Sequence, residues 1–96
     1  MPQVRISAEA ENDVDQIMIY TTARWGWRQT DKNIARLEDG FELLAGRPSI
    51  GRTCGSIRPG LRRFEIGNHV VFYLADSDGV LIVRVLHEQM LPTNYL

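Results

Sequence analysis

Arginine, histidine and tyrosine side chains in the second half of the chain are of the types that cleave RNA. An arginine can hold the scissile phosphate, and a histidine or tyrosine can transfer protons. The candidates are Arg62, Arg63, Arg84, His87 and Tyr95. The formal net charge of −1 argues against this chemistry, because binding RNA normally needs a broad cationic surface that neutralises many phosphates. An RNA-cleaving domain stays open as an alternative.

Other residue types that often do chemistry lack partners at a suitable spacing. His69 and His87 fall in separate predicted strands without a second ligand at metal spacing, so we expect hydrogen-bonded or surface histidines. Cys54 lies among arginines that could lower its pKa, but no histidine is near it in the sequence, and an inert thiol is favoured. The glycines between 51 and 60 do not match a phosphate-binding loop. We therefore expect no catalytic residue, no metal and no cofactor.

Five arginines and no acidic residue lie between residues 43 and 64, whereas the segments on either side are acidic. Arginine makes planar, bidentate contacts with carboxylates and phosphates. A local cationic patch on a nearly neutral chain favours docking to an acidic protein surface over binding a nucleic acid backbone. A solvated loop is the alternative. The five residues are Arg47, Arg52, Arg58, Arg62 and Arg63.

The length of 96 residues predicts a single domain, spanning 1–96, with one two-layer core. Hydrophobic residues make up 44% and charged residues 24%, as in a soluble globular protein. The single cysteine, Cys54, excludes an internal disulfide. With a start that has no apolar leader, it indicates a reducing, cytoplasmic environment. The longest apolar run, 70–75, is far shorter than the ~20 residues that cross a bilayer.

The first half of the chain carries helical periodicity. Residues 4–6 are enough for one strand, and Ser7 is a typical helix N-cap. Apolar residues then recur at steps of three and four over 10–25, and again over 34–44 after a break at Gly26. Two helices joined by so short a break predict an antiparallel hairpin.

Two tryptophans flank the break at Gly26. Trp25 continues the first apolar stripe, so we expect it in the core. Trp27 lies off the stripe, and packing at the helix junction is favoured over a role as an interface anchor. Neither tryptophan is therefore predicted to be a binding residue.

The second half predicts a β-meander. Residues 47–60 are rich in Gly, Pro and Ser and predict a loop. Strands are expected at 61–66, 69–74 and 80–87, with tight turns between them. The order β-α-α-β-β-β predicts an α+β fold in which the helical hairpin packs on one face of a small antiparallel sheet.

The last two predicted strands are apolar on both faces. Strict alternation places Leu81, Val83 and Val85 on one face and Val80, Ile82, Arg84 and Leu86 on the other. One helical hairpin covers only one face of a sheet. Either the 47–60 loop and the C-terminal tail cover the second face, or a partner chain does.

Several motifs along the whole chain point to one family. In the second half they are Gly60-Leu61-Arg62-Arg63, the Gly67 hairpin, the strand ending at Tyr73 and Ile82-Val83-Arg84-Val85-Leu86-His87. In the first half they are Ser7, Ala10, Asp13-Val14, Ile17, Trp25-Gly26 and the Pro48…Gly51 exit from the second helix. With these features the chain resembles ParE-type toxins of the ParE/RelE superfamily. The resemblance implies the β-α-α-β-β-β fold already expected from periodicity.

The resemblance also implies a function. ParE-type toxins are taken to block DNA gyrase by binding, and a ParD-like antitoxin neutralises them by wrapping a C-terminal segment around the toxin. A cytoplasmic hetero-oligomer with the antitoxin is therefore expected, without direct binding to nucleic acid or membrane. The alternative is a ribosome-dependent mRNA endonuclease of the RelE type, with His87 and Arg84 as catalytic candidates. An inactive family member that only binds partners is the third possibility.

Seven residues are expected to contact the antitoxin or the target. Arg58, Arg62 and Arg63 are expected to make polar contacts, and Leu86, His87, Met90 and Leu91 to form the tail region that the target recognises. Leu91 stands where family members often carry Asp. The antitoxin is expected on the helical stripe and the sheet edge, with its acidic residues on the arginines.

Overall fold

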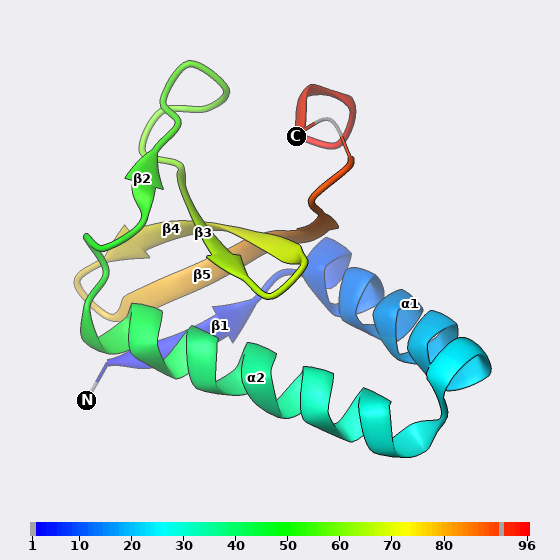
Figure 1. The fold of residues 1–96 in the computed structure, drawn as a ribbon. Helices are drawn as coiled ribbons and strands as arrows, with labels where there is room; N and C mark the ends of the chain where they lie inside the picture. The colour runs from blue at the N-terminus through cyan, green and yellow to red at the C-terminus, as the bar shows by residue number, and fades with distance from the viewer. Residues whose placement is uncertain (1, 91) are drawn as a thin grey trace.

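The structure, a computed structural model, describes residues 2–90 and 92–96 (Figure 1). Its elements are β1 (Gln3–Ile6), α1 (Ala8–Trp25), α2 (Trp27–Gly46), β2 (Arg52–Thr53), β3 (Arg62–Ile66), β4 (His69–Asp76), β5 (Gly79–His87) and a 3₁₀ turn η1 (Pro92–Asn94). The predicted order β-α-α-β-β-β is confirmed, with one addition, since the short strand β2 lies inside the predicted loop. In the described part of the chain no helix is both long and apolar enough to cross a bilayer.

The five strands form one mixed sheet in the order β1-β5-β4-β3-β2. The meander β3–β4–β5 is antiparallel as predicted, but β1 runs parallel to β5, with Val4 opposite Val80. The sheet is therefore mixed, because β1 adds one parallel pair to the expected antiparallel strands. At the start of this pairing, a Cβ on Gly79 would lie 2.1 Å from the carbonyl oxygen of Gln3. Only glycine lets the two strands approach so closely, and its φ of 139° also favours glycine.

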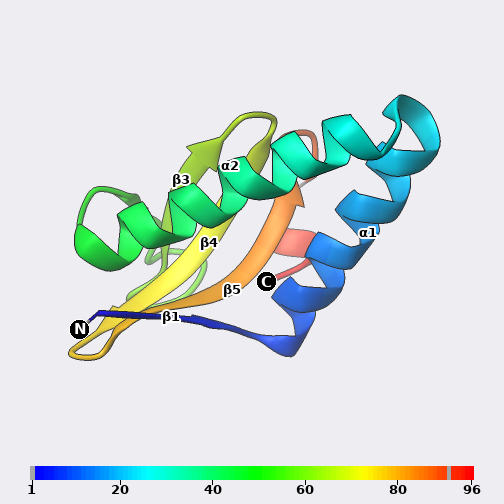
Figure 2. The same ribbon diagram turned by 90° about the horizontal axis from the view of Figure 1, so that it is seen from below.

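The two helices form the predicted hairpin and cover one face of the sheet (Figures 1 and 2). Ser7 caps α1, since its hydroxyl accepts a hydrogen bond from the backbone N–H of Ala10. Gly26, with φ of 87°, separates the helices. At 1.5 Å per residue α1 is about 27 Å long. The closed end of the hairpin projects beyond the strands in both views.

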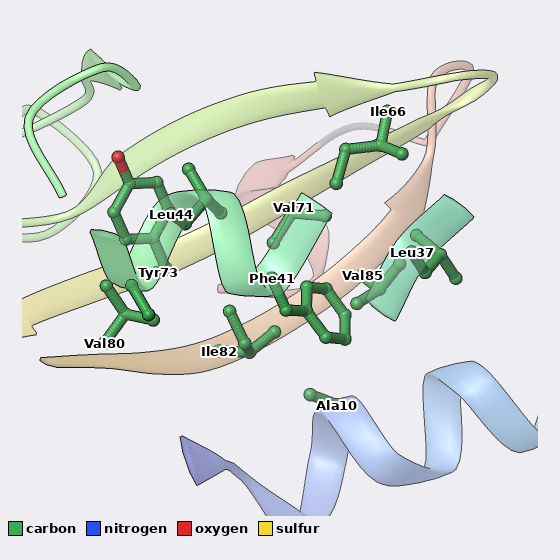
Figure 3. Packing of buried hydrophobic residues seen from close by; sticks show 11 residues of the cluster. Ala10, Leu37, Phe41, Leu44, Ile66, Val71, Tyr73, Val80, Ile82 and Val85 are labelled. Carbon is green, nitrogen blue, oxygen red and sulfur yellow. The ribbon is translucent and has the colours of Figure 1, made fainter. Parts of the chain in front are cut away.

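The main core lies between the hairpin and the sheet (Figure 3). Its buried residues are Ala10, Leu37, Phe41, Leu44, Ala45, Ile66, Val71, Tyr73, Val80, Ile82 and Val85. The hydroxyl of Tyr73 donates to the carbonyl oxygen of Pro48 at 2.6 Å and accepts from the N–H of Gly51 at 3.0 Å. Both partners lie on the segment between α2 and β2, so one core side chain fixes the exit from the helical layer.

The second face of the sheet is covered by the chain itself. A second cluster of buried residues lies there: Leu61, Val70, Phe72, Val83 and Leu86. Cys54 and Ile57 of the 47–60 loop pack against it, as do Met90 and Leu96 of the tail. Of the two covers considered for this face, the structure has the loop and the tail. The apolar second face is therefore no argument for a partner chain.

A β-bulge in β5 changes which side chains share a face. Phe72 is opposite Arg84, whereas the next residue, Tyr73, is opposite Ile82, so Val83 is the extra residue. Strict alternation therefore fails beyond Val83. The prediction was wrong for Val85, which packs in the main core, and for Leu86, which packs in the second cluster. The shift also places Arg84 on the face of Phe72, beside the C-terminal tail.

Candidate protein-binding site

Arg84 is held by Asp13 of α1 in a bidentate ion pair. Its Nε and Nη2 donate to the two carboxylate oxygens at 2.8 and 2.7 Å. These hydrogen bonds raise the pKa of the Arg84 guanidinium above its usual value. The remaining Nη1 donates to the backbone carbonyl of Tyr95 at 2.9 Å, which ties the tail to β5. Arg84, a candidate for holding a phosphate, has all three guanidinium nitrogens engaged inside the chain.

The Asp13 carboxylate also bonds to the backbone of β5, just beyond the end of β1. Asp13 accepts a hydrogen bond from the backbone N–H of Val85 at 2.9 Å. Just before it, Ser7 donates its N–H to the carbonyl of Ile82 and its hydroxyl to the carbonyl of Val83. The start of α1 thus satisfies backbone groups that would otherwise face no strand. In the sequence Asp13 stood out only as part of the Asp13-Val14 motif, and its pairing with residues 71 and 72 positions away leaves no local signal.

The two histidines lie opposite each other on β4 and β5. Their rings are in edge-to-face contact, with centroids 5.9 Å apart. Burial and the neighbouring His87 lower the pKa of His69, and Glu88 opposes this shift. His87 is exposed, and its Nδ1 accepts a hydrogen bond from the N–H of Gln89 at 3.2 Å. His87 is thus a hydrogen-bonded surface residue, as expected, whereas His69 is half-buried.

The three predicted contact arginines differ in what they do. Arg62 donates to the carbonyls of Ser49 and Gly51 at 3.2 and 2.7 Å, so it holds the chain after α2. Arg63 lies on the opposite face, 5.5 Å from the ring centre of Phe72. Its buried Nε has no hydrogen-bond partner within the described residues. Arg58 is exposed on the loop.

The predicted tail residues also separate. Leu86 is only 1% exposed and packs in the second cluster, so its side chain offers no surface in this structure. Met90 is half-buried against the same cluster, and its sulfur accepts from the N–H of His87. His87 is exposed. Leu91 lies outside the described residues.

An open groove of about 270 Å³ runs between the two helices and the end of β1. Its lining is apolar at the bottom and acidic at the rim: Ile6, Val14, Ile34, Leu37 and Phe41, with Glu11, Asp15 and Glu38. We call it the hairpin groove. It contains the helical stripe on which the antitoxin was expected, but its charge is negative, a feature that the sequence analysis missed. Apolar side chains flanked by basic ones would complement it.

A second groove, of about 340 Å³, lies at the β2–β3 end of the sheet. It is lined by Ile50, Arg52, Arg63, Phe64 and Glu65. Arg52 and Glu65 form an ion pair of 2.5 Å, but both side chains are largely exposed, and such pairs stabilise a fold weakly. This edge groove brings together two of the five arginines of the cationic patch.

The tryptophans are the clearest departure from expectation. Trp25 is 66% exposed and Trp27 is 63% exposed, so the placement of Trp25 in the core was wrong. Thr21 is the last buried residue of the first stripe, because the closed end of the hairpin has no sheet beneath it. The length of the first helix, which exceeds the width of the sheet, could have predicted that its last turn is exposed.

The fold is that of the ParE/RelE-like toxins. A solved structure described as the chromosomal ParDE TA system from P. aeruginosa covers 91% of this chain and 96% of its own, with a TM-score of 0.76 and 17% sequence identity. The family model "ParE toxin of type II toxin-antitoxin system, parDE" matches residues 4–92.

Relatives in the sequence comparison agree with this class. Toxin ParE1 of Caulobacter vibrioides is 38% identical over 90 residues, which are 94% of this chain and 93% of its own. Toxin ParE1 of Mycobacterium tuberculosis is 36% identical over 86 residues, 88% of each chain. Toxin ParE of Escherichia coli is 36% identical over 86 residues, 88% of this chain and 84% of its own. The chain belongs to the ParE family of toxins of type II toxin–antitoxin systems.

Proposed function

We propose that the protein arrests growth in the cytoplasm by binding DNA gyrase and that a ParD-like antitoxin neutralises it. Membership of the ParE family carries the first part of the proposal. The observation that favours binding over catalysis is the state of Arg84, because each of its three guanidinium nitrogens already donates to Asp13 or to the Tyr95 carbonyl. A toxin of this kind inhibits stoichiometrically and needs no cofactor.

The hairpin groove is proposed to hold the antitoxin. Its apolar floor suits the apolar face of an amphipathic helix, and its acidic rim suits basic residues beside that face. The edge groove, with Arg52 and Arg63, is proposed to take acidic residues of the same segment. One antitoxin segment with basic and acidic stretches in turn would complement both grooves.

The predicted contact residues remain proposals. Arg58 and Arg63 are proposed to contact the antitoxin or the target directly, whereas Arg62 acts by holding the Ser49–Gly51 backbone. His87 and the half-buried Met90 are proposed for the target-binding tail together with Leu91. Leu86 contributes by supporting the tail from within.

Two assays with the purified chain test the function. Supercoiling by DNA gyrase should be inhibited at about equimolar toxin, and the ParD-like protein of the neighbouring reading frame should restore it. Cleavage of mRNA on translating ribosomes should be absent. Cleavage that disappears in His87→Ala would replace gyrase inhibition with the RelE-type activity.

A further inference from the structure

Aromatic and cationic side chains surround the closed end of the hairpin. We call this surface the hairpin tip, formed by Tyr20, Arg24, Trp25, Trp27 and Arg28. All three aromatic side chains are more than 60% exposed. The tip lies beyond the strands, away from both core clusters (Figures 1 and 2). Two exposed tryptophans on one small chain exceed what packing requires, and tryptophan, tyrosine and arginine are the residues that dominate binding energy at interfaces.

The tip is held firmly by polar contacts between the helices. The hydroxyls of Thr22 and Thr30 are 2.7 Å apart and hydrogen-bonded. The N–H of Gly26 donates to the Thr22 carbonyl, and the N–H of Thr30 donates to the Gly26 carbonyl. The backbone that carries Trp25 and Trp27 is therefore already ordered, so binding a partner there costs little backbone conformational entropy.

The charge of the tip is positive. Arg24 lies 5.9 Å from the ring centre of Tyr20 and 5.8 Å from that of Trp25, and Arg28 lies 5.4 Å from that of Trp27. Neither arginine is in an ion pair within residues 2–90 and 92–96. The negative C-terminal end of α1 and the positive N-terminal end of α2 meet at Gly26, so the positive charge of the tip comes from the two arginines.

We infer that the hairpin tip is a docking surface separate from the grooves, and that it binds an acidic segment of the target protein that also presents an apolar side chain. The arginines, which lie over the rings, offer their donors to carboxylates, while the rings contact the apolar side chain. The assignment to a target rests on the proposed function. The cationic charge distinguishes the tip from the hairpin groove on the same two helices, whose rim is acidic.

The charges also argue against two other occupants. A second copy of the chain, docked tip to tip, would bring four guanidinium groups together. A single-stranded nucleic acid could stack on the rings. However, Asp15 and Asp31 are the nearest acidic residues on either side of the two arginines. A phosphate backbone that extends beyond Arg24 and Arg28 would therefore be repelled by carboxylates.

Substitutions at the tip and matched substitutions elsewhere on α2 test the inference. Trp27→Ala is paired with Leu43→Ala, another exposed apolar residue of the same helix. Arg28→Glu is paired with Arg36→Glu, two turns further along. Each variant is measured for growth arrest on induction and for inhibition of gyrase supercoiling. Its affinity for the ParD-like antitoxin and for a single-stranded oligonucleotide of about 20 nucleotides is also measured. Circular dichroism checks the fold.

The tip variants should lose growth arrest and gyrase inhibition at least about thirtyfold, while antitoxin affinity stays within about twofold and the control variants behave as wild type. Tip variants that remain as toxic as wild type, that lose antitoxin affinity equally, or that lose only single-strand binding overturn the inference. If wild type arrests growth without inhibiting gyrase and the tip variants lose that arrest, the inference holds and gyrase is the wrong target.

Discussion

The Asp13 carboxylate accepts three hydrogen bonds from β5. Its side chain is 9% exposed and satisfies both the Arg84 guanidinium and the Val85 N–H. A buried pair of this kind adds little stability when compared with apolar residues of similar size, but breaking it is costly. The reason is that the surviving partner keeps its charge without compensation.

Asp13→Ala should therefore lower the free energy of unfolding by about 3 kcal/mol, because Arg84 and the Val85 N–H both lose their acceptor. Urea denaturation measures the change. Asp15→Ala, an exposed acid on the same helix, is the control and should change stability by less than about 0.5 kcal/mol. Equal losses in the two variants would show that the ion pair is not what stabilises this edge.

His69 predicts a pH dependence of stability. Its pKa is lowered in the fold from an ordinary value of 6.5, so the unfolded chain binds more protons below that pH. The stability contributed by neutral His69 is complete above 6.5 and is lost as the pH falls toward the folded pKa. The urea midpoint should therefore drop between about pH 7.5 and 5.5, and His69→Gln should flatten this drop. His87→Gln removes only the smaller cause and should keep most of the slope.

The connection from α2 to the sheet depends on one glycine at close range. A Cβ on Gly51 would lie 2.4 Å from the Tyr73 hydroxyl and 2.8 Å from the Arg63 carbonyl oxygen. Gly46, five residues earlier at the end of α2, has open space at the corresponding position. Comparing substitutions at Gly51 and Gly46 therefore distinguishes a steric requirement for glycine from the effect of its backbone flexibility.

Gly51→Ala should lower the free energy of unfolding by about 2 kcal/mol, because it displaces Tyr73 from its hydrogen bonds to the segment after α2. Gly46→Ala should be neutral or stabilise by up to about 1 kcal/mol through helix propensity. Thermal and urea unfolding of both variants provide the comparison. A Gly51→Ala variant as stable as Gly46→Ala would mean that the Tyr73 anchor is dispensable.

At the scale of the molecule, charge divides the surface into regions with different requirements. The hairpin groove is acidic at its rim, whereas the segment between residues 43 and 64 and the hairpin tip are cationic. A net charge of −1 conceals this division. Electrostatic complementarity sets partner choice and association rate, so different partners can use different regions.

Asp15→Lys combined with Glu38→Lys should weaken antitoxin binding about tenfold, because the change reverses the charge at the rim of the hairpin groove. Calorimetry with the ParD-like antitoxin measures the affinity. Glu42→Lys, an exposed acid on α2 outside the groove, is the matched control. Unchanged affinity in the double variant would place the antitoxin elsewhere on the toxin.

Interactions between neighbouring residues determine most of the secondary structure of this protein. Ser7 begins α1 and Gly26 ends it, because capping and left-handed backbone conformations are properties of neighbouring residues. The spacing of apolar residues indicated both helices and the antiparallel meander correctly. The resemblance to ParE-type toxins was drawn separately, from motifs along the chain, and the family comparison confirms the family.

Tertiary structure decided what depends on residues far apart in the chain. The bulge at Val83 reverses the alternation of β5, and the loop and tail, rather than a partner, cover the second face. Asp13 meets Arg84 across 71 positions. Trp25 is exposed because the hairpin extends past the sheet, a relation between two elements that helical periodicity does not contain. These outcomes depend on packing between residues far apart in the chain, which is defined only when all elements are in place.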